Sequence, residues 1–275
     1  MVLCGSDQIW NPFFSLDTVY FLDFQVPYPK VAYAASMVDI RLVSEYDKYP
    51  SVPALLKDFS AISVRENSAR TIVNQLTDGA IQAAVVLDPT LLLTQDEWCQ
   101  NVEIPVLQKE KYIFCYTYYI TGMQKVLIQQ MAQAYGCSTV IISDLLKSDM
   151  PEMPGLHIER AENVSIEMFL SLIKNAEAVV TDSFHGTAFS IQFEKMFFAV
   201  ESTQSKEELL ENGKPRSHID RIATLLEKDG VTSQLLRYGK EDSAQIENPI
   251  DYEAVNKKLA QERASSLEWL RDAIG

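Results

Sequence analysis

The feature that most constrains the fold is a repeated alternation of short apolar runs with segments of helical periodicity. In the first hundred residues, runs rich in small and β-branched apolar residues alternate with stretches whose apolar residues recur every three or four positions. Strands that alternate with helices in this way favour a parallel sheet covered by helices. The predicted strands are residues 2–4, 31–35, 61–64 and 84–87, and the predicted helices are residues 52–58 and 67–76.

The second half of the chain repeats this alternation more regularly. A polar stretch from Asp96 to Lys111, which contains Pro105, separates the two halves. We therefore predict an α/β protein with a domain of residues 1–105, a second of residues 106–245, and a terminal amphipathic helix within residues 246–275. In the second half the predicted strands are residues 112–116, 139–142, 178–181 and 196–200, and the predicted helices are residues 122–135, 166–175 and 186–193.

Composition limits the kinds of partner. Lys and Arg number 24 and Asp and Glu 38, so the formal net charge of −14 would repel a nucleic acid. No apolar run approaches the roughly 20 residues that span a bilayer, and the first residues do not resemble a secretion signal. The four cysteines are widely spaced, which favours reduced thiols over disulfides. These features predict a cytoplasmic protein that neither binds nucleic acid nor spans a membrane.

The first candidate site follows the predicted strand at residues 178–181, where positions 182–187 read Asp-Ser-Phe-His-Gly-Thr. Ligands of α/β proteins bind at the carboxyl ends of parallel strands, and a helix that starts there offers unpaired N–H groups to a phosphate or carboxylate. Gly186 would let such an anion approach the backbone, and His185 could donate a hydrogen bond or a proton to it. The alternative is that Asp182 or Ser183 only caps the helix and that His185 is a partly buried packing residue.

The second candidate site follows the first predicted strand, where positions 5–12 read Gly-Ser-Asp-Gln-Ile-Trp-Asn-Pro. This cluster of hydrogen-bonding side chains suits a sugar. Trp10 could offer its ring face to a pyranose, and Asp7 could orient or deprotonate a hydroxyl group. The alternative is an Asx-type turn with Trp10 as an anchor in the core.

Other residues and absent motifs narrow the chemistry further. Asp88 directly follows a predicted strand, where it either shapes the site or forms a simple turn. The sequence has no phosphate-binding P-loop, dinucleotide-binding glycine motif, nucleophile elbow or HExxH motif, and its three histidines cannot form a histidine-rich metal site. We predict neither a cofactor nor a metal. The cations that could complete an anion site are Arg65, Arg160, Lys214, Arg216 and Arg221.

Six stretches that occur in the same order along residues 2 to about 226 resemble the polysaccharide pyruvyl transferase family. The resemblance implies two Rossmann-like domains in a GT-B-like arrangement, with the active site in the cleft between them. It also implies phosphoenolpyruvate as the donor, a sugar diol as the acceptor, and a pyruvate ketal on a surface or capsular polysaccharide as the product. The matching stretches are residues 5–12, 20–24, 32–36, 62–66, 87–91 and 181–187.

Carried onto this chain, His185 resembles the donor-site histidine of the family and is our candidate general acid. Ser183, Gly186 and Thr187 are the expected donor-binding residues, together with Arg65 and Arg216 as weaker matches. Asp7 is the candidate base for the acceptor hydroxyl, a role inferred from its chemistry. The expected acceptor-binding residues are Ser6, Gln8, Trp10 and Asn11.

Family members usually carry a longer segment before the Gly-Ser-Asp-Gln stretch, so we expect the first domain to be N-terminally incomplete. Two other functions stay open on the sequence. One is a GT-B-like glycosyltransferase that uses a nucleotide sugar, and the other is a truncated, non-catalytic protein that binds a glycan or another partner.

Overall fold

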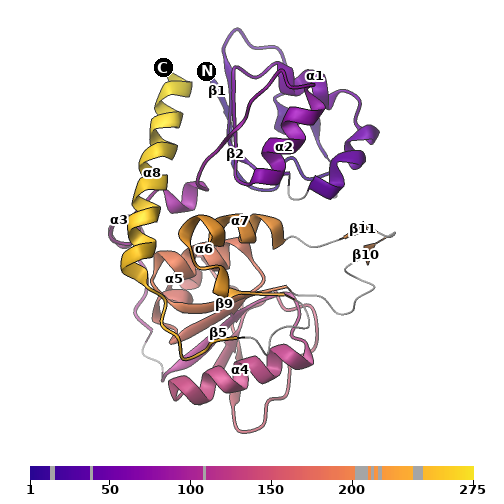
Figure 1. Cartoon of the computed structure of the whole chain (residues 1–275). Coiled ribbons are helices and arrows are strands. Elements are labelled where there is room, and N and C mark those ends of the chain that lie inside the picture. Colours follow the sequence, from indigo (N-terminus) through magenta and orange to yellow (C-terminus); the bar gives the residue numbers. More distant parts are fainter. Residues whose placement is uncertain are drawn as a thin grey trace. The chain divides into compact units, whose positions relative to one another are not determined.

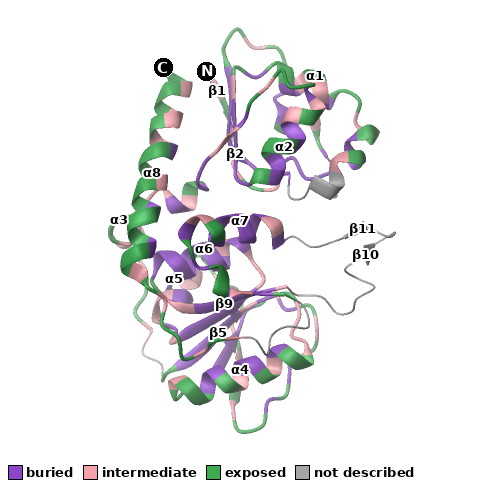
Figure 2. Ribbon diagram, in the orientation of Figure 1, coloured by how far each residue is buried: buried purple, intermediate pink, exposed green. Residues whose placement is uncertain are grey.

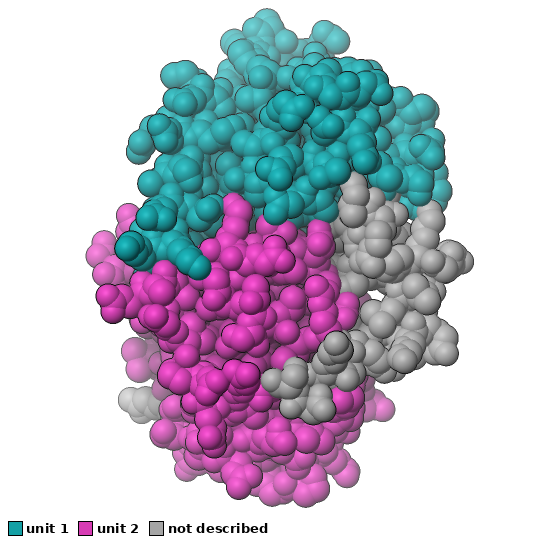
Figure 3. All heavy atoms as spheres, viewed as in Figure 1, with its two compact units in different colours: residues 1–92, 256–275 teal, residues 93–255 magenta. Residues whose placement is uncertain are grey.

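The chain forms two α/β units (Figures 1 and 3). Unit 1 contains Met1–Leu92 and Asn256–Gly275, and unit 2 contains Leu93–Val255. The structure is a computed structural model. It describes residues 1–12, 16–37, 40–107, 110–201, 210–211, 214–215, 219–237 and 244–275.

Unit 1 is built on a four-stranded parallel sheet in the order β1-β2-β3-β4, so its strands are in sequence order. The strands are β1 (Val2–Cys4), β2 (Lys30–Ala35), β3 (Ala61–Val64) and β4 (Ala84–Val85). The helices of the first segment are α1 (Val52–Lys57), α2 (Asn67–Leu76) and the 3-10 helices η1 (Thr18–Phe21), η2 (Ile40–Lys48) and η3 (Pro89–Leu91). Because all four strands are parallel, the residues that follow them gather at one edge of the sheet.

The core of unit 1 has an aromatic centre. Trp10 is completely buried, and its ring stacks on Phe21 with the ring centroids 5.0 Å apart. Phe59 packs edge-on against the same indole at 5.7 Å. Large aromatic side chains bury much apolar surface, so this cluster fixes the segment after β1 against α1 and the start of β3.

The C-terminal helix α8 (Tyr252–Ile274) packs on unit 1 through its second half. Ser266 Oγ accepts a hydrogen bond from the Leu87 backbone N–H at 2.9 Å. The Trp269 ring lies 6.1 Å from the Tyr33 ring of β2. The predicted amphipathic helix therefore forms, and these contacts bury part of its apolar surface.

Unit 2 contains a six-stranded parallel sheet in the order β12-β9-β8-β5-β6-β7. The chain runs from β5 outward to β6 and β7, then returns to β8 on the other side of β5 and continues to β9 and β12. The point at which the strand order reverses lies between β5 and β8, and ligands of open α/β sheets bind at such a switch point. The strands are β5 (Tyr112–Tyr116), β6 (Thr139–Ile142), β7 (His157–Arg160), β8 (Ala178–Thr181), β9 (Met196–Val200) and β12 (Leu235–Leu236).

The helices of unit 2 lie around this sheet, and the central strands are buried between them (Figure 2). A two-stranded antiparallel ribbon, β10 (Leu210–Glu211) and β11 (Lys214–Pro215), forms a separate sheet. The helices are α3 (Gln95–Asn101), α4 (Gly122–Tyr135), α5 (Ile166–Asn175), α6 (Phe184–Gln192), α7 (Ile219–Asp229) and the 3-10 helix η4 (Thr232–Gln234).

The two units divide the chain at different points from the predicted domains 1–105 and 106–245. Helix α3 belongs to unit 2, where Trp98 packs edge-on against Phe189 at 5.2 Å. Most of α8 belongs to unit 1. Both differences come from contacts between residues far apart in the sequence, which periodicity does not record.

Among the described residues, none of the helices combines the length and the apolar character that a membrane span requires.

Candidate functional site

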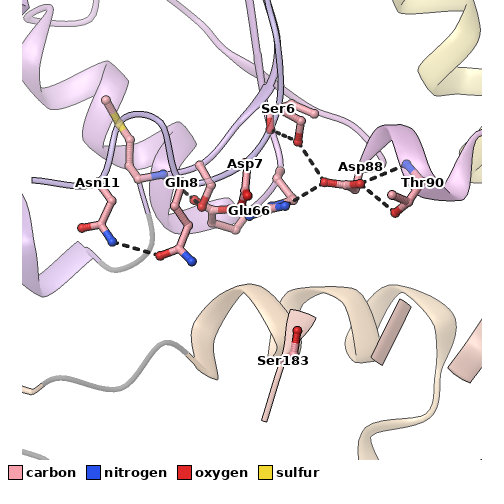
Figure 4. A network of polar contacts seen from close by, with 12 residues as sticks. Ser6, Asp7, Gln8, Asn11, Glu66, Asp88, Thr90 and Ser183 are labelled. Atoms are coloured by element: carbon pink, nitrogen blue, oxygen red, sulfur yellow. Dashed lines mark hydrogen bonds and ion pairs between the residues drawn. The ribbon is translucent and has the colours of Figure 1, made fainter. Parts of the chain in front are cut away.

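Polar side chains that follow three strands of unit 1 meet in one network (Figure 4). Arg65, the residue after β3, donates from Nη1 to Asp88 Oδ2 at 2.7 Å and from Nη2 to Asp7 Oδ1 at 3.2 Å. Ser6 Oγ donates to the same Asp88 oxygen at 2.8 Å. The segments that follow β1, β3 and β4 are therefore joined by charge-assisted hydrogen bonds at the carboxyl edge of the sheet.

The residue after Arg65 extends the network to β2. Glu66 is completely buried, and its Oε1 accepts from Ser36 Oγ at 3.0 Å and from the Met37 backbone N–H at 2.8 Å. Ser36 directly follows β2. Each of the four strands is thus followed by a residue of this network.

Asp7 differs from the other acidic residues of the network in its exposure. Its side chain is 59% exposed, whereas those of Glu66 and Asp88 are 0% and 2% exposed. Its φ of +80° lies in the left-handed region, which a residue other than glycine seldom adopts. The Asp7 carbonyl accepts a hydrogen bond from Ser36 N–H at 2.9 Å, which helps to hold this conformation. Strained backbone of this kind clusters at functional sites, and the Asp7 side chain is the exposed end of this network.

The remaining predicted acceptor residues divide into two groups. Ser6 belongs to the network, and the partly exposed Gln8 accepts from Asn11 Nδ2 through its Oε1 at 3.0 Å. Trp10 and Asn11 are completely buried. The prediction that Trp10 presents a ring face to a sugar is therefore wrong. Its indole N–H donates to the Tyr20 carbonyl at 2.9 Å and its ring stacks on Phe21, so it anchors the core.

The second cluster lies at the switch point of unit 2. Asp182, which follows β8, accepts through Oδ2 from Thr117 Oγ1 at 2.8 Å and from the Tyr118 backbone N–H at 3.0 Å. Because Thr117 and Tyr118 follow β5, Asp182 links the two loops between which the strand order reverses. The carboxyl edge of this sheet is therefore braced at the position where ligands of such sheets bind.

Ser183 is the N-cap of α6, as the capping alternative predicted. Its Oγ accepts from the Gly186 N–H at 3.4 Å, and its carbonyl accepts from the Thr187 N–H at 3.0 Å and from Thr187 Oγ1 at 2.9 Å. The helix begins at Phe184, two residues before the predicted start. Ser183 itself is partly exposed.

Gly186 is required for packing. A Cβ at this position would lie 2.2 Å from Thr181 Oγ1, 3.0 Å from Thr181 Cβ and 3.1 Å from Tyr116 Cδ1. The space beside the glycine is filled by the sheet, and both Gly186 and Thr187 are buried. This corrects the prediction that Gly186 admits a ligand to the backbone.

His185 is a partly exposed side chain of this turn. It occupies the second position of α6, and its ring lies perpendicular to the Phe184 ring with the centroids 5.6 Å apart. Tyr116 on the neighbouring strand cannot act as a base, because burial raises its pKa to about 12, and the charges of Tyr118, Asp144 and Asp182 act in the same direction.

The predicted cations have different surroundings. Arg65 lies in unit 1 with Asp7, whereas Ser183, Gly186 and Thr187 lie in unit 2. Arg216 lies outside the described residues. Arg160 Nη2 donates to the Leu146 carbonyl at 3.1 Å. Arg221 of α7 is buried, and its guanidinium carbon lies 6.0 Å from the centre of the Phe184 ring, next to His185 in the sequence.

Sequence reasoning gave no site role to Glu66 and Thr117. It left Asp88 open as a residue that shapes the site or forms a simple turn, and it considered Asp182 only as a helix cap. The available signal was their position, because each follows a predicted strand of a parallel sheet within three residues. Their long-range partners are 23 to 82 residues away in the sequence, and the sequence gives no local sign of these pairs.

Comparison with known proteins supports the same fold and family. A sequence model described as polysaccharide pyruvyl transferase matches residues 1–205. Curated protein sequences give no match. The structure is similar to a Listeria monocytogenes protein described as a UDP-N-acetylglucosamine 2-epimerase, with a TM-score of 0.52 and 12% identity over 95% of this chain and 67% of that one. A UDP-GlcNAc 2-epimerase from Neisseria meningitidis has a TM-score of 0.46 and 13% identity over 97% of this chain and 76% of that one.

At such low identity, the likeness to the Listeria protein shows the fold alone. It supports the predicted class, a GT-B-like fold built from two Rossmann-like parallel α/β units. The family model spans residues 1–205 of 275 and includes every stretch in which the sequence resembles the family. The chain therefore belongs to the polysaccharide pyruvyl transferase family.

Proposed function

We propose that this protein transfers a pyruvyl group from phosphoenolpyruvate to two hydroxyl groups of a sugar in a surface or capsular polysaccharide, which forms a cyclic ketal. The observation that carries the proposal is the partly exposed His185 at the start of α6, on the loop that Asp182 fixes at the switch point of the unit 2 sheet. Family membership supplies the reaction class.

The donor half of the reaction is assigned to unit 2. The N-terminal end of α6 carries partial positive charge, which favours the phosphate and carboxylate of the donor. His185 in its cationic form donates a proton to the methylene carbon of the enol phosphate, and the adjacent carbon becomes electrophilic. The partly exposed Ser183 is assigned to bind the donor beside His185.

The acceptor half is assigned to unit 1. The Asp7 carboxylate accepts the proton of the attacking sugar hydroxyl as the carbon–oxygen bond forms. Ser6 and Gln8 are assigned to orient the sugar. Attack of the second hydroxyl on the same carbon closes the ring as the bond from that carbon to the phosphate oxygen breaks. The phosphate leaves with the two electrons of this bond and takes up the proton of the second hydroxyl.

The test combines binding with product analysis. Phosphoenolpyruvate should raise the melting temperature, because a ligand that binds only the folded state stabilises it. Incubation with a glycan acceptor should then release phosphate and give the methyl signal of a pyruvate ketal in the NMR spectrum. Stabilisation by a nucleotide sugar alone would identify a glycosyltransferase. Stabilisation by phosphoenolpyruvate without phosphate release, over a panel of acceptors, would identify a non-catalytic protein.

A further inference from the structure

Both carboxylate oxygens of Asp88 accept hydrogen bonds within the unit 1 network. Its Oδ1 accepts from the Thr90 N–H at 3.0 Å and from Thr90 Oγ1 at 2.7 Å. Its Oδ2 accepts from Arg65 Nη1 at 2.7 Å and from Ser6 Oγ at 2.8 Å. One oxygen is thus held by the cap of η3, and the other holds two residues of the candidate site.

Ser6 and Arg65, the two residues that donate to Asp88 Oδ2, are each connected to Asp7. Ser6 precedes Asp7 in the chain, and its hydroxyl also lies 2.9 Å from the Ala34 carbonyl of β2. Arg65 contacts the Asp7 carboxylate directly through Nη2. Asp88 therefore holds the backbone next to Asp7 through Ser6, and it holds the Asp7 side chain through Arg65.

Because Asp88 is buried, its carboxylate can hold Arg65 and Ser6 but cannot contact a ligand directly. Its side chain is 2% exposed, and the Arg65 side chain is 1% exposed. Charge-assisted hydrogen bonds in such surroundings are short and strongly directional. The Arg65 guanidinium is a rigid planar group, so an oxygen that fixes Nη1 also fixes the direction of Nη2.

We propose that Asp88 is a positioning residue, which aligns the Asp7 carboxylate by holding Arg65 and Ser6. The inference rests on the proposed function, in which Asp7 accepts the proton of the sugar hydroxyl. A displacement of about 1 Å in a reacting group can cost roughly 10²-fold in rate. The role is therefore visible in turnover more than in substrate affinity.

The central variant is Asp88→Asn, which keeps the shape of the side chain. The amide oxygen can still accept from Thr90, but the amide nitrogen now faces the donors of Arg65 and Ser6. We expect kcat to fall by about 10- to 100-fold, with the KM for the acceptor little changed. Thr90→Val, which removes only the hydroxyl that steadies Asp88, should give a smaller fall in kcat and is available if Asp88→Asn does not fold.

The matched control is Asp58→Asn. Asp58 pairs with Lys30 at the start of β2, so it belongs to an ion pair of the same unit at the opposite edge of the sheet. This variant should change the melting temperature without lowering kcat. A fall in kcat equal to that of Asp88→Asn would mean that any lost ion pair in unit 1 impairs turnover, and the positioning role would be rejected.

The double variant tests whether Asp88 acts through Asp7. If it does, Asp7→Asn combined with Asp88→Asn should be no slower than Asp7→Asn alone, because the group being positioned is already lost. If the fall in kcat of the double variant equals the product of the two single falls, Asp88 does not act through Asp7 and the proposal is overturned.

A spectroscopic measurement separates this inference from the proposed function. In wild type, the hydrogen-bonded Nη2 protons of Arg65 should give resolved NMR signals, assigned by their loss in Asp7→Asn. Asp88→Asn should shift or remove these signals, and Asp58→Asn should retain them. If the wild-type protein shows no pyruvyl transfer, the proposed function fails. The Nη2 signals of Arg65 still test whether Asp88 aligns Arg65 with Asp7. Unchanged Nη2 signals in Asp88→Asn would refute the alignment itself.

Discussion

At the scale of a single residue, the packing of the unit 2 sheet requires a glycine at position 186. Its neighbours Thr181 and Tyr116 leave no room for a Cβ. Thr181 cannot easily move, because its hydroxyl donates to the Tyr116 carbonyl at 2.7 Å and accepts from the Ser183 N–H at 3.0 Å. Any side chain at position 186 therefore displaces the loop that carries His185.

Gly186→Ala should lower the free energy of unfolding by about 1–3 kcal/mol, the usual cost of overpacking a well-filled interior. Urea unfolding followed by circular dichroism measures this change. The matched control is Gly122→Ala at the start of α4, where a Cβ would meet nothing within 4 Å. That variant should leave stability unchanged or raise it by up to about 1 kcal/mol. Equal effects at the two glycines would contradict the packing role of Gly186.

His185→Gln distinguishes the catalytic and packing interpretations of that histidine. As the general acid, His185 should be worth roughly 10²–10⁴ in turnover, whereas the melting temperature should change little because the side chain is only partly buried. Phosphate release and a melting curve measure the two properties. Near-normal turnover in this variant would remove His185 from the mechanism, whatever the melting curve shows.

At the scale of elements, the contact between α8 and the segment that follows β4 joins two residues that are 179 positions apart. Ser266 supplies the acceptor for the buried Leu87 N–H, directly before Asp88. The Leu87 carbonyl accepts from the Tyr33 hydroxyl at 3.0 Å. Helix α8 thus helps to hold the strand end from which the unit 1 network begins.

Ser266→Ala should cost about 1–3 kcal/mol of stability, because it leaves a buried backbone donor without its acceptor. Ser265→Ala is the matched control, since the Ser265 hydroxyl is exposed and contacts only carbonyls of its own helix. That substitution should have almost no effect. Denaturant unfolding of both variants tests the difference, and similar losses would show that the Ser266 contact adds nothing specific.

At the scale of the whole molecule, the reactivity of the four cysteines depends on how deeply each thiol is buried in the fold. All four are free thiols, and Cys4, Cys115 and Cys137 are buried whereas Cys99 is partly exposed. Burial raises the pKa of Cys4 to about 12 and that of Cys115 still further, so these thiols stay protonated in the folded protein. The thiolate is the reactive form.

We therefore expect one cysteine of the folded protein to react rapidly with a thiol reagent and all four to react after denaturation. Cys99→Ser should abolish the rapid phase. Two or more rapidly reacting thiols in the folded protein would show that a unit opens readily or that one of the buried sites is accessible.

The fold class followed from the sequence because periodicity is a local property. The bounds of β5, β6, β8 and β9 and of α4 and α5 agree with the predicted ones. Strand β7 was not predicted, because it is an edge strand with partly or fully exposed residues and carries no apolar run. The family also followed from the sequence, since its motifs are short stretches whose order alone identifies it.

Tertiary structure decided the surroundings of the candidate residues. The sequence left Trp10 open as a sugar platform or a core anchor, and packing against Phe21 and Phe59 made it an anchor. It placed Arg65 with the donor residues, whereas the folded chain pairs it with Asp7 and Asp88, 58 and 23 residues away. The sequence thus predicted most strands of the two parallel sheets and the polar residues that follow them. Which of those residues meet depended on strand order and on long-range packing, because hydrogen bonds and burial act through space and leave no local pattern in the chain.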